Sequence, residues 1–92
     1  MKAAGNAAAQ ILKSLYCEYK SEGPPALKSL AVIQQETGLD YNRVTRLVRD
    51  LAKEELARYW ELGDVAGIGP KGIEICRDPQ LFSQRFPGVP LP

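Results

Sequence analysis

The most regular alternation of apolar and polar positions lies between Asp40 and Lys53. Its apolar residues recur at three- and four-residue spacing, which places them on one face of a helix: Val44, Leu47, Val48 and Leu51. Asp40 is a favourable N-cap, because its carboxylate can accept a hydrogen bond from a free amide in the first turn. The pattern predicts a helix over residues 41–53 with one buried face and one basic, solvent-facing side.

A shorter helix is predicted immediately before it, over residues 30–37. Ser29 is a suitable cap for its start, and Gly38 can end it by taking a positive φ. Only Gly38 and Leu39 separate this helix from the Asp40 cap. The two helices should therefore meet through a turn of about three residues, which is a helix-turn-helix arrangement with a glycine in the turn.

The N-terminal part of the chain predicts one longer helix. We expect residues 1–5 to be a frayed tail and Asn6 to cap a helix that begins in the alanine run 7–9. The helix should end near Ser21, because the Gly-Pro-Pro sequence at 23–25 cannot continue it. Its apolar stripe either packs in the core or faces a partner chain: Ile11, Leu12, Leu15, Tyr16 and Tyr19.

The chain then changes to a strand pattern. Residues 56–62 include aromatic side chains that favour a strand, and residues 65–68 are long enough to return beside it. The Gly63-Asp64 pair between them predicts a tight hairpin turn. A further short extended segment is expected at residues 26–28. We expect Trp60 to pack in the core or in a dimer interface, rather than to stack on a base or a sugar.

Two short helices are expected to close the chain. Pro70 fits the first position of a helix of about two turns that buries Ile73 and Cys76. Asp78-Pro79 repeats the signal of a cap followed by proline, so residues 80–86 should form one or two further turns. The inner side of this last segment would carry Leu81, Phe82 and Phe86.

Composition limits the remaining choices. The 92 residues, 45% hydrophobic and 25% charged, suit one small globular domain. We expect its core at about residues 7–77 and a C-terminal extension at 78–92. The formal net charge of +1 means that nucleic-acid binding would need a local cluster of basic residues. No run approaches the roughly 20 apolar residues of a membrane span, and no signal peptide is evident. A cytoplasmic protein without membrane contact is therefore expected.

The chemistry available for catalysis is sparse. Cys17 and Cys76 are the only cysteines and there is no histidine, so the usual four-ligand zinc site cannot form. The two cysteines form either a disulfide or two free thiols, and a reducing compartment favours the thiols. Without histidine, the commonest general base is missing. We therefore expect no metal, no cofactor and no enzymatic activity.

Three helices, a hairpin and a closing helix in this order resemble the winged helix-turn-helix fold of small bacterial and archaeal transcriptional regulators. The resemblance covers about residues 7–77 and rests on the 29–40 segment, the 41–53 helix and the Gly63-Asp64 turn. The 68–74 run is similar to the junction that precedes the last helix of many such regulators. The fold class implied is mainly α with a small β-hairpin: a three-helix core, a wing hairpin and a C-terminal helix.

The resemblance implies that the 41–53 helix enters the major groove of duplex DNA. Arg43 or Arg46 would hold a guanine edge and Asn42 an adenine edge. The acidic turn at 61–64 would be repelled by phosphate, so the helix would bind almost unaided. Carried over by position, the DNA-facing residues are Tyr41, Asn42, Arg43, Thr45, Arg46 and Arg49, with Lys53, Arg58 and Lys28 meeting phosphates.

Two alternatives remain open from the residues alone. Asp50 and Glu54 lie at helical spacing from the arginines, so intrahelical ion pairs could make this only a solvated face. A winged-helix protein-interaction module or assembly subunit is the alternative function. The leading hypothesis is sequence-specific DNA binding for transcription regulation, by a homodimer formed through the first helix and the C-terminal segment.

Overall fold

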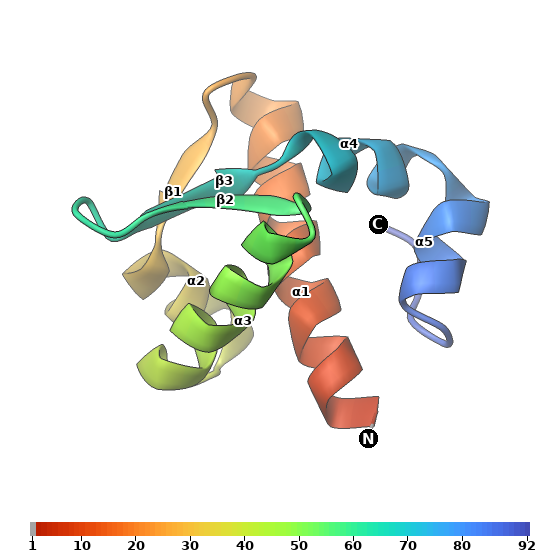
Figure 1. Cartoon of the computed structure of the whole chain (residues 1–92), viewed down its shortest axis with the longest axis horizontal. Helices are drawn as coiled ribbons and strands as arrows, with labels where there is room; N and C mark the ends of the chain where they lie inside the picture. The colour runs from red at the N-terminus through yellow and green to blue at the C-terminus, as the bar shows by residue number, and fades with distance from the viewer. Residues whose placement is uncertain (1) are drawn as a thin grey trace.

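The computed structural model of the protein describes the backbone of residues 2–92 and the side chains from Asn6 onward. The described residues form mainly helices with a small antiparallel sheet (Figure 1). The elements in chain order are α1 (Lys2–Glu22), β1 (Leu27–Ser29), α2 (Leu30–Thr37), α3 (Tyr41–Lys53), β2 (Ala57–Trp60), β3 (Val65–Ile68), α4 (Pro70–Arg77) and α5 (Pro79–Arg85).

Helix α1 starts earlier than its sequence pattern predicts. It begins at Lys2, so Asn6 lies inside the helix and the predictions of an Asn6 cap and of a frayed tail are wrong for residues 2–5; Met1 lies outside the described residues. Alanines also precede Asn6, and their helix propensity offsets the cost of about 1 kcal/mol for the single Gly5. The helix ends at Gly23, whose φ is +73° and whose amide donates to the Tyr19 carbonyl at 2.8 Å.

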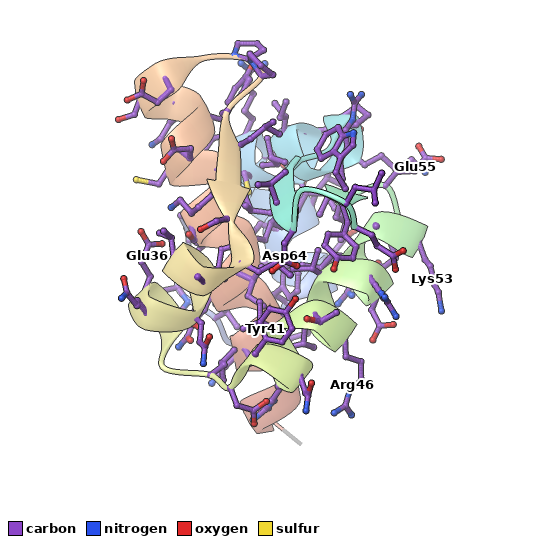
Figure 2. All side chains as sticks on the ribbon, turned by 90° about the vertical axis from the view of Figure 1, so that its left-hand side faces the viewer. Glu36, Tyr41, Arg46, Lys53, Glu55 and Asp64 are labelled. Atoms are coloured by element: carbon purple, nitrogen blue, oxygen red, sulfur yellow. The ribbon has the colours of Figure 1, made fainter. Side chains whose placement is uncertain are left out.

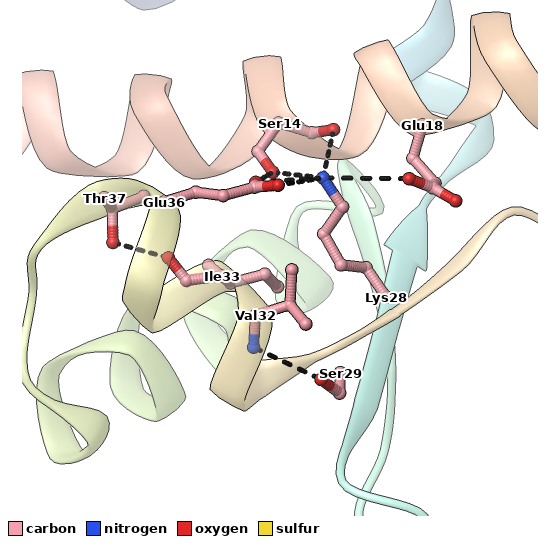
Figure 3. Close-up of polar contacts among 8 residues, drawn as sticks. All are labelled: Ser14, Glu18, Lys28, Ser29, Val32, Ile33, Glu36 and Thr37. Carbon is pink, nitrogen blue, oxygen red and sulfur yellow. Dashed lines mark hydrogen bonds and ion pairs between the residues drawn. The ribbon is translucent and has the colours of Figure 1, made fainter.

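The two helices of the turn motif begin and end where predicted. The Ser29 hydroxyl accepts a hydrogen bond from the Val32 amide at 3.2 Å, as Figure 3 shows, and Gly38 ends α2 with a φ of +75°. The Asp40 carboxylate accepts from the Arg43 amide at 2.8 Å and caps α3. These local contacts confirm the predicted bounds of both helices.

The sheet has one strand more than the predicted hairpin. Its order is β1-β3-β2, with both pairs antiparallel, and Gly67 of the central strand lies between Leu27 and Arg58. The extended segment expected near residues 26–28 is therefore β1. Strand β2 is shorter than the predicted 56–62, because Glu61 and Leu62 belong to the turn. Asp64, with a φ of +53°, takes the left-handed conformation in that turn.

The core lies between α1, the inner face of the sheet and the other helices (Figure 1). The C-terminal segment belongs to it, because Phe82 and Phe86 of α5 are buried with their ring centroids 5.2 Å apart. Lys13 of α1 places its amine 5.9 Å from the centroid of the Phe82 ring. The other large side chains that are fully buried are Ile11, Leu12, Leu15, Leu30, Ile33, Val44, Val48, Leu51 and Leu56.

Helix α4 approaches β2 through a glycine. A Cβ on Gly72 would lie 2.2 Å from the Leu56 carbonyl oxygen, so only glycine allows this approach. The buried face of α4 therefore runs through Gly72 and Cys76, and Ile73 is half-buried rather than buried as predicted. Cys76 and the exposed Cys17 are free thiols, and burial raises the pKa of Cys76 to about 11.

Candidate nucleic-acid interface

Helix α3 has the two faces that its sequence predicts. Val44, Val48 and Leu51 are buried, whereas Arg46 and Lys53 are exposed on the other side. Figure 2 shows Arg46 and Lys53 extending from α3 away from the body of the protein. A shallow depression on this face brings together five of the predicted DNA-facing residues and one acid: Asn42, Thr45, Arg46, Arg49, Asp50 and Lys53.

The cations on this face differ in what they contact. Arg43, Arg46 and Lys53 form no ion pair with the part of the chain that the structure describes. Arg43 is half-buried, so Arg46 and Lys53 are the most accessible of the three. Thr45 donates its hydroxyl hydrogen bond to the Tyr41 carbonyl at 2.9 Å, within the helix.

Arg49 pairs with the hairpin turn rather than with its own helix. Its guanidinium donates to the Glu61 carboxylate and lies 5.8 Å from the centroid of the Tyr59 ring. Glu54 pairs with Arg85 of α5, at 2.7 Å from Nε to Oε1, and this lowers the pKa of Glu54. For Arg49 and Glu54, the alternative of intrahelical pairing does not hold, because both form ion pairs with residues of distant segments.

Tyr41 makes the second contact between α3 and the hairpin turn. Its hydroxyl donates to the Asp64 carboxylate at 2.7 Å, and the Tyr59 hydroxyl lies 3.4 Å from the same oxygen. The hydrogen bond to Asp64 raises the pKa of Tyr41. Figure 2 shows Tyr41 and Asp64 close together between the start of α3 and the turn. Both acids of the turn are thus engaged by residues of α3.

These partners also define what the turn presents to solvent. With Glu61 and Asp64 directed to α3, the fully exposed side chain at the tip is Leu62. The acidic repulsion expected from this turn is reduced, because Arg49 offsets one of its two charges. No spacing in the sequence could reveal these contacts, because their partners are 12 and 23 positions apart.

Arg58 lies apart from the other predicted DNA-facing residues. Side chains alternate between the two faces of a strand. Ala57 is buried and Tyr59 contacts Arg49, so Arg58 points to the opposite, outer face of the sheet. There it lines a groove instead of the α3 surface.

Lys28, expected to meet phosphate, is instead enclosed by the protein. Its side chain is only 9% exposed, and its amine lies 2.9 Å from the Glu36 carboxylate and 2.8 Å from the Ser14 hydroxyl. Ser14 also donates to Glu36 at 2.6 Å, and these hydrogen bonds lower the pKa of Glu36. Figure 3 shows this cluster joining α1, β1 and α2, with Glu18 at 3.8 Å. The phosphate-contact prediction for Lys28 is therefore wrong.

Comparisons with known proteins add no further assignment. No protein-family model, curated protein or solved structure matches the chain. Among the described residues, no helix combines the length and apolarity needed to cross a bilayer. The same residues contain no group of three or more side chains arranged to hold a metal ion.

Proposed function

We propose that this chain is a winged helix-turn-helix protein that binds duplex DNA in a sequence-specific manner. The element order α1-β1-α2-α3-β2-β3 and the sheet order β1-β3-β2 support the fold. The observation that carries the function is the exposed face of α3, where Arg46 and Lys53 stand without ion pairs in the described chain. A helix anchored on one side and basic on the other suits the major groove.

The α3 residues divide into two roles in this proposal. Arg46, an exposed arginine of α3 without an ion pair in the described chain, holds the O6 and N7 atoms of a guanine, and Asn42 contacts an adjacent base edge. Lys53 contacts phosphate at the end of the helix. Arg49 can exchange Glu61 for a phosphate, because its side chain is 54% exposed. Tyr41 holds the hairpin turn against α3 through Asp64.

A single α3 reads only a few base pairs, so the proposal includes a homodimer on a pseudo-palindromic site. The dimer would form through the exposed faces of α1 and of the C-terminal segment, because Ile11, Leu12 and Leu15 of α1, together with Phe82 and Phe86, are buried in the core of the single chain. Promoter occupancy would then regulate transcription. Sedimentation velocity over a wide concentration range tests the dimer. A monomer at the highest concentration would exclude it and leave the DNA-binding proposal to its own experiment.

The DNA-binding experiment compares two double variants by fluorescence polarisation with random duplex DNA. Arg46→Gln with Lys53→Gln should weaken binding about tenfold or more at low salt. The slope of the logarithm of the binding constant against the logarithm of the salt concentration should fall by about two, since about two phosphate contacts are lost. The matched control, Arg77→Gln with Lys71→Gln, removes two exposed cations from α4 and should bind like the unchanged protein. Equal losses from both pairs would mean that α3 is not the binding surface.

One observation favours a second function. The hairpin exposes Leu62 completely and Trp60 by 44%, which suits a protein-interaction module. If the unchanged protein fails to bind DNA at low salt, this module becomes the leading function. Leu62→Ser would then be the variant to test against an isolated partner.

A further inference from the structure

A groove on the outer face of the sheet has no role in the proposed DNA contacts. It has a volume of about 270 Å³, just below the roughly 300–1,000 Å³ typical of sites for drug-sized molecules. Its walls come from the loop after α1, from all three strands and from the start of α4. The most prominent lining side chains are apolar: Tyr19, Pro24, Pro25, Leu27, Trp60 and Ile73.

The floor of the groove depends on a glycine in the central strand. A Cβ on Gly67 would lie 3.2 Å from both the Ala26 carbonyl oxygen and the Leu27 side chain, and 3.9 Å from the Trp60 ring. A larger side chain at Gly67 would therefore occupy the space between Leu27 and Trp60. Both of these apolar side chains are 44% exposed. Trp60 is thus not buried in the core, which was one of its two predicted positions, but forms a wall of the groove. The other predicted position, a dimer interface, stays a prediction.

The groove carries one charge. Among the described residues that line the groove, Arg58 is the only one with a positive charge, and none is an aspartate or glutamate. Arg58 is exposed and forms no ion pair within the described part of the chain. An arginine beside apolar walls favours an anion over a neutral ligand, because its planar guanidinium can donate two parallel hydrogen bonds to one carboxylate.

We propose that this groove binds a small monocarboxylate with a flat, apolar body. The body lies over Gly67 between Leu27 and Trp60, and the carboxylate accepts hydrogen bonds from Arg58. We expect a flat ligand because aromatic and proline side chains form the walls of the groove, and a small ligand because the groove has a small volume. Arg58 and the exposed face of α3 lie on opposite sides of the sheet, because Arg58 and Tyr59 point to opposite faces of β2.

Trp60 provides an intrinsic fluorescent probe in the wall of the groove. It also lines a neighbouring hollow with Arg49, Lys53 and Leu62. It is the only tryptophan of the chain, so its fluorescence reports directly on the groove. This provides a binding signal that needs neither DNA nor an added label.

The experiment titrates phenylacetate into the full chain and follows Trp60 fluorescence, with isothermal calorimetry as the second readout. Phenylacetate should bind saturably, and the neutral phenylacetamide at least tenfold more weakly. Arg58→Gln should weaken phenylacetate binding about tenfold without changing phenylacetamide binding, and Arg58→Lys should recover part of the loss. Arg77→Gln, which removes an exposed cation at the end of α4 that does not line the groove, is the matched control and should bind like the unchanged protein.

A second variant tests the floor of the groove. Gly67→Val should abolish binding of both probes, with circular dichroism showing that the variant is folded. The proposal is overturned if the two probes bind equally, if Arg58→Gln and Arg77→Gln behave alike, or if no binding occurs at about 10 mM phenylacetate, where an affinity of ~1 mM would be near saturation. DNA polarisation is measured separately, so failure here leaves the α3 result unchanged.

Discussion

Two sets of charged contacts in this protein use similar chemistry at very different depths. The Lys28 cluster, formed by Ser14, Glu18, Lys28 and Glu36, encloses its cation, whose side chain is 9% exposed. The α3–turn contacts, Arg49 with Glu61 and Tyr41 with Asp64, lie on the surface, where the Arg49 side chain is 54% exposed. The enclosed cation is therefore structural: Lys28 cannot leave its partners for phosphate without losing several hydrogen bonds of a side chain withdrawn from water, whereas Arg49 can.

The energetic reason lies in desolvation. When a lysine amine is withdrawn from water, each hydrogen bond to this charged group contributes about 1.5–3 kcal/mol to the stability of the folded protein. Removing its partners therefore destabilises the fold. An exposed ion pair contributes at most about 1 kcal/mol, because water and salt screen it. We therefore expect the Lys28 cluster to act on stability and the α3–turn contacts to act on binding.

The largest expected effect is on unfolding. Lys28→Met should lower the free energy of unfolding by about 1–2 kcal/mol, because Glu36 and the Ser14 hydroxyl lose their cationic donor. Urea unfolding followed by circular dichroism measures it. Arg49→Met is the matched control and should change stability by less than about 0.5 kcal/mol. Similar losses from the two variants would abolish the distinction between the two sets of contacts.

The next effect concerns pH. The pKa of Glu36 is lowered from 4.5, mainly by the Ser14 hydrogen bond and then by Lys28. The unfolded chain therefore binds the proton more readily, and the stabilisation is complete above pH 4.5 and lost as the pH falls through the lower folded value. Glu36→Gln should remove part of the loss of stability that occurs as the pH falls below 4.5, by up to about 1 kcal/mol.

Acid unfolding curves of three proteins test this pH dependence. Glu74→Gln removes an exposed carboxylate of α4 that has no ion pair within the described chain, and should follow the unchanged protein. A Glu36→Gln curve with the same slope as that of Glu74→Gln would show that the Lys28 cluster contributes nothing in acid. Arg85 lowers the pKa of Glu54 in the same direction, so this pair also loses its stabilising effect in acid. Both variants should therefore keep some dependence of stability on pH.

The smallest effect concerns the α3–turn contacts and rests on the proposed DNA binding. Glu61→Gln should raise DNA affinity about two- to fivefold at low salt, because the carboxylate that neutralises Arg49 and repels phosphate is removed. Its melting temperature should stay close to that of the unchanged protein. Polarisation with Glu74→Gln as the control measures it. A fall in affinity would mean that Glu61 instead holds Arg49 in its binding position.

Local signals in the sequence predicted the helices well where a cap and a period agree. Ser29, Gly38 and Asp40 each act through neighbouring amides or their own φ, so α2 and α3 follow from short-range chemistry. The start of α1 was less predictable, because the alanines on both sides of Asn6 favour the helix equally. The second position after α3 is also unusual: Glu55, with a φ of +63°, takes the left-handed conformation that glycine would adopt more easily.

The candidate site was predictable only as a helix face. The periodicity that buries Val44 and Val48 also exposes Arg46 and Lys53, and the structure has both features. Whether a given lysine or arginine forms an ion pair within the protein could not be predicted from the sequence. Lys28, Arg49 and Arg58 looked alike along the chain, yet one is enclosed, one is paired across the surface and one lines a groove.

Local patterns along the chain are sufficient to predict the helix bounds near the turn motif, the basic side of α3 and the apolar faces, including that of Phe82 and Phe86. The packing of distant segments makes β1 the third strand of the sheet and opens a groove at Gly67 beside Arg58. The two groups of features differ in the distance along the chain over which the responsible interactions act. Caps and periods act over a few residues, whereas charge partners and cavities depend on how distant segments pack, and many sequences with the same local pattern would pair them differently.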